Sequence, residues 1–339
     1  MSDSKPLTIG VVGAGEIARR AHLPVLMNMP DVEMGWIYDH RPERAEALGR
    51  AYGIRAVHSA AADGLPACDV ALLAIPVDVR GEYLQQFSSS GTAVLCEKPF
   101  AINSEEHARI VSDFPLHALG CGLMRRFYRS TTLLRDLVAS AVLGPLLRIE
   151  VSEGNRSKGS GVDSSFLDDP RFAASRGVLM DLGSHSLDLA LYISGAESFD
   201  IKSCSKEMDG NVDRKVSAKI QLALGSHAAS RPVEFDYCVS WLDKQANRIC
   251  LRFERAVVWS ELSVTGAVTL GDPEIPGHSI AMTSHLPGAT TYNQAFYLEW
   301  RAFLDGLRAQ RESAVSGRSA LLTTALVERL LAWDGTGRA

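Results

Sequence analysis

The feature that most constrains this chain is a glycine-rich turn close to its start. The stretch TIGVVGAGEIARRAHLPVL, residues 8–26, joins a short apolar run to a helical pattern through the turn GAGEIA, residues 13–18. This G-x-G-x-x-A pattern, placed between an expected strand and an expected helix, is typical of a dinucleotide cradle. The first glycine permits a sharp turn, the second lets a pyrophosphate approach the backbone, and the alanine lets helix and strand pack closely. The predicted cofactor contacts in the turn are Gly13, Gly15, Glu16, Ile17 and Ala18.

The end of the second expected strand bears on which dinucleotide would bind. Tyr38-Asp39 lies about 20 residues beyond the turn, where an acidic side chain can accept the ribose hydroxyls. A carboxylate there would also repel the 2′-phosphate of NADP, so Asp39 favours NAD. His40 and Arg41 follow directly, and because a guanidinium can bind that phosphate, they leave NADP open.

Hydrophobic patterning divides the chain into two parts. Up to about residue 123, short apolar runs such as DVALLAIP alternate with helical patterns, which predicts a parallel sheet covered on both faces. Beyond it, runs such as RKVSAKIQLAL alternate apolar and polar residues, as in an antiparallel sheet with one covered face. We predict an α/β fold with a doubly wound dinucleotide-binding domain, residues 1–123. A second α/β domain with an open, mainly antiparallel sheet follows, residues 124–339, whose final helices can pack back on the first.

Composition excludes several classes of function. The formal charge of −5 and the pI near 6.0 give no general attraction to nucleic acid or to acidic membranes. The six cysteines form no CxxC pair and several lie in apolar runs, which indicates free thiols in a reducing compartment. No apolar run reaches membrane-spanning length. We therefore expect a soluble cytoplasmic protein without nucleic-acid or membrane partners.

Glu97-Lys98-Pro99 ends the fourth expected strand. Ligands of an open parallel sheet lie beyond the carboxyl ends of its strands, so Lys98 is expected to point toward a bound cofactor. Its ammonium can hydrogen-bond a substrate oxygen and favour the alkoxide-like form. From these three residues alone, a surface lysine that ends a strand is an equal alternative.

The stretch MDLGSHSLD, residues 180–188, places three polar side chains at helical spacing. Asp181, His185 and Asp188 stand at i, i+4 and i+7, so one helix face would carry all three. A histidine can exchange a proton near neutral pH and a carboxylate one turn away can orient it. From the helix alone, the solvated face of an amphipathic helix is the better interpretation. Asp and His could also bind a metal, but no other cluster offers further ligands, and we predict none.

Taken in order, the cradle, Glu97-Lys98-Pro99 and the Asp181–His185 helix resemble the Gfo/Idh/MocA family, named for glucose–fructose oxidoreductase and inositol dehydrogenase. VLCEKPFAINSEEH and GVLMDLGSHSLDLALYISG are similar to its signatures, and the resemblance covers nearly the whole chain. It implies a Rossmann domain, then an α/β domain whose open sheet often joins subunits into a dimer or tetramer. It also implies hydride transfer between a nicotinamide and a secondary alcohol carbon of a sugar, polyol or nucleotide sugar. Lys98, Asp181 and His185 would be the catalytic residues.

The resemblance also assigns contacts around the reacting atoms. It implies a cis Lys98–Pro99 bond, with His185 taking the hydroxyl proton, Lys98 polarising the oxygen and Asp181 positioning the substrate or the imidazole. Further cofactor contacts are expected from Ile75, Pro76, Arg80, Glu97 and Lys98, where Ile75 and Arg80 depart from the family's usual Thr and His. The expected substrate contacts are Lys98, Arg126, Asn155, Arg176, Asp181 and His185, together with Arg156, Tyr237 and Trp241.

Arg176 stands where relatives often have glycine. It would favour an anionic substrate, or else form a salt bridge within its loop. Two other functions share the family's fold: a non-catalytic dinucleotide sensor and an NAD-dependent glycosidase that oxidises its substrate transiently. The presence of Lys98, Asp181 and His185 together argues against the sensor.

Overall fold

The glycine turn follows the central strand of a parallel sheet. In the computed structural model, which describes residues 5–59, 64–156, 175–225, 231–275, 277, 279–282 and 285–335, this sheet has six strands in the order β3-β2-β1-β4-β5-β6. The order reverses between β1 and β4, which is where dinucleotides bind in such sheets. The strands are β1 (Leu7–Val12), β2 (Val32–Tyr38), β3 (Ala56–Val57), β4 (Val70–Leu73), β5 (Ala93–Cys96) and β6 (Leu119–Cys121).

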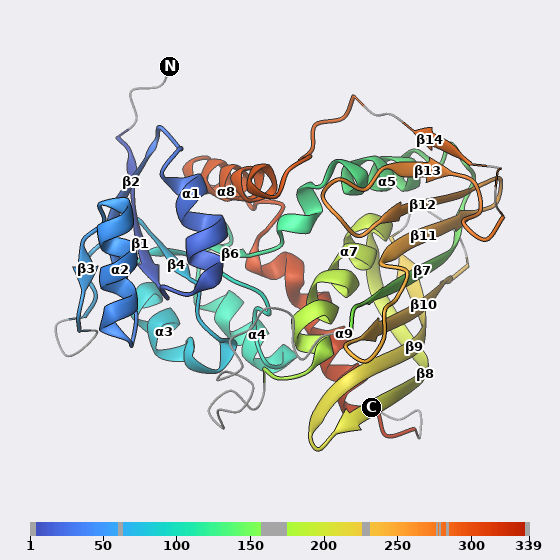
Figure 1. The fold of residues 1–339 in the computed structure, drawn as a ribbon, viewed down its shortest axis with the longest axis horizontal. Helices are drawn as coiled ribbons and strands as arrows, with labels where there is room; N and C mark the ends of the chain where they lie inside the picture. The colour runs from blue at the N-terminus through green and yellow to red at the C-terminus, as the bar shows by residue number, and fades with distance from the viewer. Residues whose placement is uncertain are drawn as a thin grey trace. The chain divides into compact units, whose positions relative to one another are not determined.

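Helices cover this sheet because its strands are apolar on both faces. All four residues of β4 and of β5 are buried, as expected for parallel strands with helices on either side. In Figure 1, α1 and α2 pass in front of the strands, and α8 packs against α1 and the turn before it. The helices are η1 (Ala18–His22), α1 (Leu23–Leu26), α2 (Pro42–Tyr52), η2 (Val77–Val79), α3 (Gly81–Ser90), α4 (Ser104–Ser112), α8 (Tyr292–Arg308) and η6 (Gly317–Ala320).

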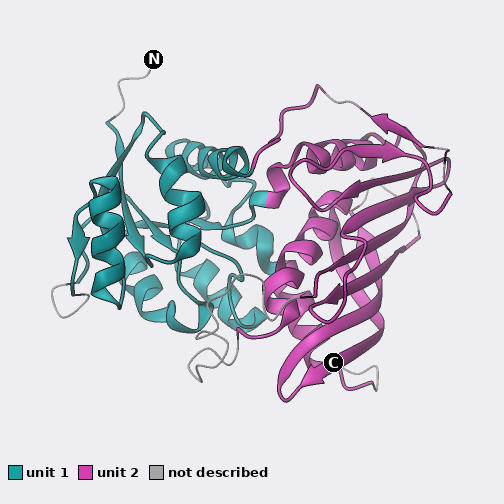
Figure 2. Ribbon diagram, viewed as in Figure 1, with its two compact units in different colours: residues 1–124, 292–321 teal, residues 125–291, 322–339 magenta. Residues whose placement is uncertain are grey.

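The chain forms two compact units, coloured separately in Figure 2. The first comprises residues 1–124 and 292–321, and the second comprises residues 125–291 and 322–339. Helix α8 therefore belongs to the first unit although it lies late in the sequence. Of the helices that the structure describes, none combines the length and hydropathy needed to cross a lipid bilayer.

The second unit is built on a mainly antiparallel sheet. Within the described ranges it has eight strands in the order β14-β13-β12-β11-β7-β10-β9-β8, and β7 with β10 is its parallel pair. The predicted fold class is confirmed. The strands are β7 (Leu146–Gly154), β8 (Ala196–Asp209), β9 (Val212–Leu224), β10 (Val233–Ser240), β11 (Arg248–Phe253), β12 (Val257–Glu261), β13 (Val268–Leu270) and β14 (Ile280–Met282).

Helices lie along one face of this sheet (Figure 1). Tyr237 of β10 points to that face, where its hydroxyl meets that of Ser186 at 3.0 Å. The predicted helix over residues 178–193 is present, but its first turn, η5, is a π-helical turn. The helices of the unit are η3 (Met124–Phe127), α5 (Arg129–Ser140), η5 (Leu179–Gly183), α7 (Ser184–Ser194) and α9 (Leu321–Ala332).

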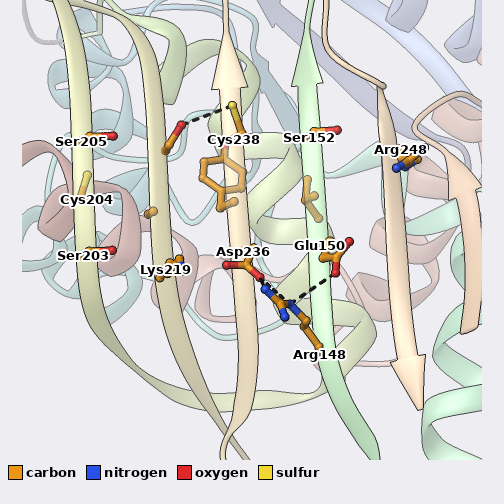
Figure 3. Close-up of a pocket in the computed structure, with 14 residues that line it drawn as sticks. Arg148, Glu150, Ser152, Ser203, Cys204, Ser205, Lys219, Asp236, Cys238 and Arg248 are labelled. Carbon is orange, nitrogen blue, oxygen red and sulfur yellow. Dashed lines mark hydrogen bonds and ion pairs between the residues drawn. The ribbon is translucent and has the colours of Figure 1, made fainter. Parts of the chain in front are cut away.

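The opposite face of the sheet is polar and shallowly hollowed. Because side chains alternate along a strand, Asp236 and Cys238 lie on the other face from Tyr237. Figure 3 shows the hollow, with Arg148 between Asp236 and Glu150; its volume is about 580 Å³. Within the second unit it therefore lies on the other side of the sheet from α7.

Candidate functional site

The backbone of the glycine turn has the form that a dinucleotide requires. Gly13 has φ +105°, and a Cβ there would lie 2.4 Å from the Ala74 carbonyl oxygen, so only glycine fits. At Gly15, no described atom comes within 4 Å of the position that a Cβ would take. This open space beside the backbone fits the close approach of a pyrophosphate. Glu16 is exposed and pairs with Arg19 at 2.6 Å.

Asp39 fixes the cradle from the end of β2. Its side chain is buried, with one carboxylate oxygen accepting from the Ala14 N–H at 2.8 Å and the other from the Arg41 N–H at 2.9 Å. The exposed His40 places Nδ1 3.2 Å from the same carboxylate. Each oxygen keeps a further acceptor site. Asp39 is therefore placed both to hold the turn and to receive a ribose hydroxyl.

The residue before Lys98 ends a buried chain of hydrogen bonds. The Trp300 indole N–H donates to His22 Nδ1 at 3.0 Å, and His22 Nε2 lies 2.8 Å from Glu97 Oε1. An indole nitrogen only donates, so Nδ1 is the acceptor and Nε2 carries the proton toward Glu97. The second Glu97 oxygen accepts from the Lys98 N–H at 3.1 Å. The backbone of Lys98 is thus tied through two side chains to α8.

Charge is concentrated around this chain of hydrogen bonds. Burial opposes ionisation of Glu97, but the hydrogen bond from His22 and the charges of Lys98 and Arg80 outweigh it and lower the pKa of that carboxyl. Glu97 is therefore an anion at neutral pH. The described side chains place an ionised carboxylate directly beside Lys98.

Arg80 holds the same turn from the other side. Its guanidinium is buried and donates to the carbonyl oxygens of Ile75 (2.9 and 2.7 Å) and Pro99 (2.5 Å). The Lys98–Pro99 bond is cis, as the resemblance implied. Arg80 was expected among the cofactor contacts, but its guanidinium donates to these backbone carbonyls. It links the loop after β4 to the turn after β5, and a direct cofactor contact stays a prediction.

In the second unit, η5 and α7 carry the other two residues expected to be catalytic. Asp181 and His185 are both partly exposed, on a helix that is otherwise largely buried. Asp188 was expected to share their face, but it is not accessible with them. It stands one turn beyond His185, where the helix is covered by other parts of the unit. There it is buried and accepts from Arg126 at 2.5 and 2.9 Å and from Thr323 at 3.1 Å.

Arg126, expected to contact substrate, is committed to this pair. It is buried, and its guanidinium also lies 4.7 Å from the centre of the Tyr192 ring. Through its ion pair with Asp188, Arg126 joins η3 to α7 within the second unit. Substrate contact by Arg126 stays a prediction.

Sequence reasoning missed the pair Arg125–Glu153. Its two hydrogen bonds measure 3.1 and 2.8 Å, and both side chains are largely buried. Burial acts to lower the pKa of Arg125, but Glu153 outweighs it and raises the value, with Tyr128 and Asp181 contributing. Asp181 therefore lies within the field of this pair. The available signal was Glu153 itself, a charged residue at an inward position of the alternating run LLRIEVSEG.

The remaining expected contacts are divided between core and surface. Tyr237 and Trp241 are buried: the Tyr237 hydroxyl lies 3.0 Å from that of Ser186, and the Arg214 guanidinium lies 5.6 Å from the centre of the Trp241 ring, so substrate contact by either stays a prediction. Asn155 and Arg156 are exposed and Arg176 is partly buried. The loop between them, residues 157–174, lies outside the described residues. Lys98 belongs to the first unit, and Asp181 and His185 belong to the second.

Two family models match this chain. Residues 7–114 match the NAD-binding Rossmann fold of an oxidoreductase family designated GFO_IDH_MocA, and residues 131–247 match the C-terminal domain of the same group. Together the matches cover more than half of the chain.

Curated relatives extend the comparison. Inositol 2-dehydrogenase of Rhizobium meliloti is 24% identical over 94% of this chain and 94% of its own length. Glucose-6-phosphate 3-dehydrogenase of Bacillus subtilis is 28% identical over 62% of this chain, and the match spans 60% of that enzyme. D-glucoside 3-dehydrogenase of Escherichia coli is 30% identical over 57% of this chain and 55% of its own.

Solved structures share the fold. A variant 3-ketoreductase from Actinomadura kijaniata, in complex with NADP, superposes with a TM-score of 0.78 at 19% identity, covering 96% of this chain and 97% of that one. An oxidoreductase from Agrobacterium radiobacter, in complex with NAD+ and L-tartaric acid, gives a TM-score of 0.76 at 19% identity over 98% of each chain.

Proposed function

Because this chain belongs to the Gfo/Idh/MocA family of oxidoreductases, we propose that it transfers a hydride between a nicotinamide dinucleotide and a secondary alcohol or ketone carbon. The substrate is a sugar, a polyol such as an inositol, or a nucleotide sugar. The relatives named for inositol, glucose 6-phosphate and glucosides support this class. The observation that carries the proposal is the cradle of Gly13, Gly15 and Asp39, followed by a lysine whose backbone is held by a buried carboxylate.

Three side chains carry the chemistry of the proposal. The bound nicotinamide supplies the hydride acceptor or donor. In oxidation, His185 accepts the hydroxyl proton of the substrate, and in reduction it returns that proton. Lys98 hydrogen-bonds the same oxygen and stabilises its developing negative charge. Asp181 orients the imidazole or a neighbouring substrate hydroxyl.

The charge of Asp39 favours NAD over NADP in this proposal. Its carboxylate accepts two backbone hydrogen bonds beside the turn, where a 2′-phosphate would meet a like charge. Wild-type protein should therefore bind NAD more tightly than NADP in a fluorescence titration. Tighter binding of NADP would show that His40 and Arg41 decide the preference.

Replacing Lys98 or His185 tests the assignment. Each of Lys98→Ala and His185→Ala should lower kcat by about 10²–10⁴-fold, because proton transfer or charge stabilisation is lost, while the Kd for NAD stays unchanged. Lys202→Ala is the matched control, since Lys202 is exposed and pairs with Asp200 on β8. Turnover that survives either replacement, with cofactor still bound, would refute these roles.

A panel of sugars, inositols and nucleotide sugars with NAD and NADP identifies the reaction. The proposal expects one NADH for each substrate oxidised. Cleavage of a glycoside without net NADH would instead identify the glycosidase, and cofactor binding without turnover of any substrate would identify the sensor.

The polar face of the second sheet fits self-association. Arg148 pairs with Asp236 and Glu150 (Figure 3). Arg252 pairs with Glu150 and Asp272, so both signs of charge alternate across neighbouring strands. A surface of this kind can be complementary to a copy of itself across a twofold axis. Arg148→Glu should therefore lower the oligomeric mass in sedimentation experiments.

The state of the cysteines supports the proposed cytoplasmic location. All six are free thiols, as is usual for proteins of a reducing compartment.

A further inference from the structure

The helix that carries Asp181 and His185 begins on a carboxylate from another element. Asp213, near the start of β9, accepts a hydrogen bond from the Leu179 N–H at 2.8 Å, and its side chain is 2% exposed. Leu179 opens η5, and the residue before it, Val178, provides no side-chain cap. The first N–H groups of a helix lack partners within the helix and favour a negative charge. Asp213 supplies both the acceptor and the charge.

The backbone before the helix is shaped to admit this carboxylate. Gly177 has φ +111°, in the left-handed region that favours glycine, and a Cβ there would lie 1.7 Å from Asp213 Oδ1. The second carboxylate oxygen therefore occupies the space that a side chain at Gly177 would fill. Gly177 and Asp213 form a fitted pair at the helix start.

The charge of Asp213 is costly for stability at neutral pH. Burial raises the pKa of this carboxyl to about 6, although hydrogen bonds from Leu179 and Val178 and the charge of Lys206 act in the opposite direction. The pKa of Asp213 is higher in the folded protein than in the unfolded chain, where it is about 4. The contribution of Asp213 to the free energy of unfolding is therefore fully present below pH 4 and is lost as the pH rises through 6. The groups facing Asp213 are Lys206 and Cys204 of β8 and Tyr237 of β10. Stability alone therefore does not account for an anion at this place.

We propose that Asp213 is a positioning residue of the active site: its carboxylate holds the first turn of the helix so that Asp181 and His185 keep their places. The inference rests on the proposed function for what that helix does. It adds a residue that touches neither the substrate nor the cofactor. Small displacements of reacting groups lower rates steeply, so loosening this turn should act on kcat.

Asp213→Asn separates positioning from stability. The variant keeps the shape and one acceptor but removes the charge. We expect kcat to fall about tenfold, the Kd for NAD to stay unchanged, and the thermal midpoint at pH 7.5 to stay equal or rise. Asp209→Asn is the matched control, since Asp209 lies on the same hairpin but is exposed and should change none of these values. A lower midpoint with unchanged kcat would reduce Asp213 to a structural role and overturn the proposal.

Amide hydrogen exchange tests the inference without turnover. Residues 179–185 should exchange about tenfold faster in Asp213→Asn, while α4 in the first unit is unaffected. If wild-type protein turns over no substrate, the proposed function fails, yet this measurement still decides whether Asp213 holds the turn. Unchanged exchange overturns it.

Gly177→Ala provides a second variant through the fitted pair. Its added methyl would collide with Asp213, so it should accelerate exchange over residues 179–185 in the wild-type background. In an Asp213→Ala background the collision is absent, and the same change should have a smaller effect. Equal effects in both backgrounds would show that the two residues are not coupled.

Discussion

The two units hold the side chains that we propose as catalytic by different means. Around Lys98, a histidine and an indole form a directional chain that ends on Glu97. Around the Asp181–His185 helix, the supports are two buried arginine–carboxylate pairs and the carboxylate of Asp213, which faces Lys206. A chain of directional hydrogen bonds through an imidazole depends on which ring nitrogen carries the proton. Buried ion pairs tolerate modest acid, but leave an uncompensated charge when one partner is removed. The units should therefore respond differently to truncation and to pH.

The largest effect is expected from breaking the buried pair of the second unit. Arg126→Ala leaves Asp188 buried without its two charged hydrogen bonds and should lower the free energy of unfolding by roughly 3–5 kcal/mol, measured in urea by circular dichroism. Arg109→Ala, which breaks an exposed pair with Asp113, should cost less than about 0.5 kcal/mol. Similar losses in the two variants would contradict the role given to burial.

Acid should weaken the first unit through His107. This side chain is buried, its Nε2 donates to the Gly317 carbonyl at 2.9 Å, and burial lowers its pKa to about 4. Above pH 6.5 the His107 imidazole is neutral in both the folded and the unfolded chain. Below pH 6.5 the unfolded chain takes up the proton first, so the free energy of unfolding falls by about 3 kcal/mol between pH 6.5 and pH 4. His107→Gln keeps a donor and should flatten this dependence between pH 7 and 4.5. Asp213 in the second unit acts with the opposite sign over a similar range.

Ion pairs also hold α8 to the rest of the first unit. Asp31 accepts two hydrogen bonds of 2.7 Å from Arg301 and another from Arg308; burial opposes them, but they lower its pKa to about 2. The depressed value gives stability above the unfolded value of about 4 that is lost as the pH falls toward 2.

Asp31→Asn should accordingly cost about 2 kcal/mol at pH 7, measured by urea unfolding. Asp305→Asn is the control, because Asp305 pairs with Arg301 from an exposed position and should cost less than about 0.5 kcal/mol. No difference between the two variants would mean that α8 is held by packing alone.

The smallest effect tests the histidine chain itself. Trp300→Phe preserves much of the ring packing but removes the donor to His22 Nδ1, which should cost about 1 kcal/mol. Nitrogen NMR of His22 should then report a mixture of tautomers in place of one. A single unchanged tautomer would show that Glu97 alone fixes the imidazole.

Local sequence was sufficient for the frame of the molecule. The buried runs of β4 and β5 and the turn at Gly13 predict a parallel sheet with a dinucleotide cradle, because each signal lies within a few neighbouring residues. The π turn at Leu179–Gly183 escaped, since a 3.6-residue period cannot reveal an extra residue in one turn.

The supports of the residues that we propose as catalytic could not be predicted in this way. Trp300 follows His22 by 278 residues, and Asp188 follows Arg126 by 62. The sequence around His22 or Arg126 gives no indication of the partner residue. Asp188 was therefore predicted to lie on an accessible helix face with Asp181 and His185, although it is buried and paired with Arg126. Glu153 was the exception, because it interrupts an apolar alternation within its own strand.

The late position of α8 sets the order in which the first unit can be completed during synthesis. The six parallel strands are translated by residue 121, but Trp300 leaves the ribosome 278 residues after the histidine that it contacts. At 5–20 residues per second this delay is roughly 15–55 s. Nearly the whole of the second unit is therefore synthesised while the nucleotide-binding unit still lacks α8. Throughout that time, the surface that α8 will cover is accessible to chaperones.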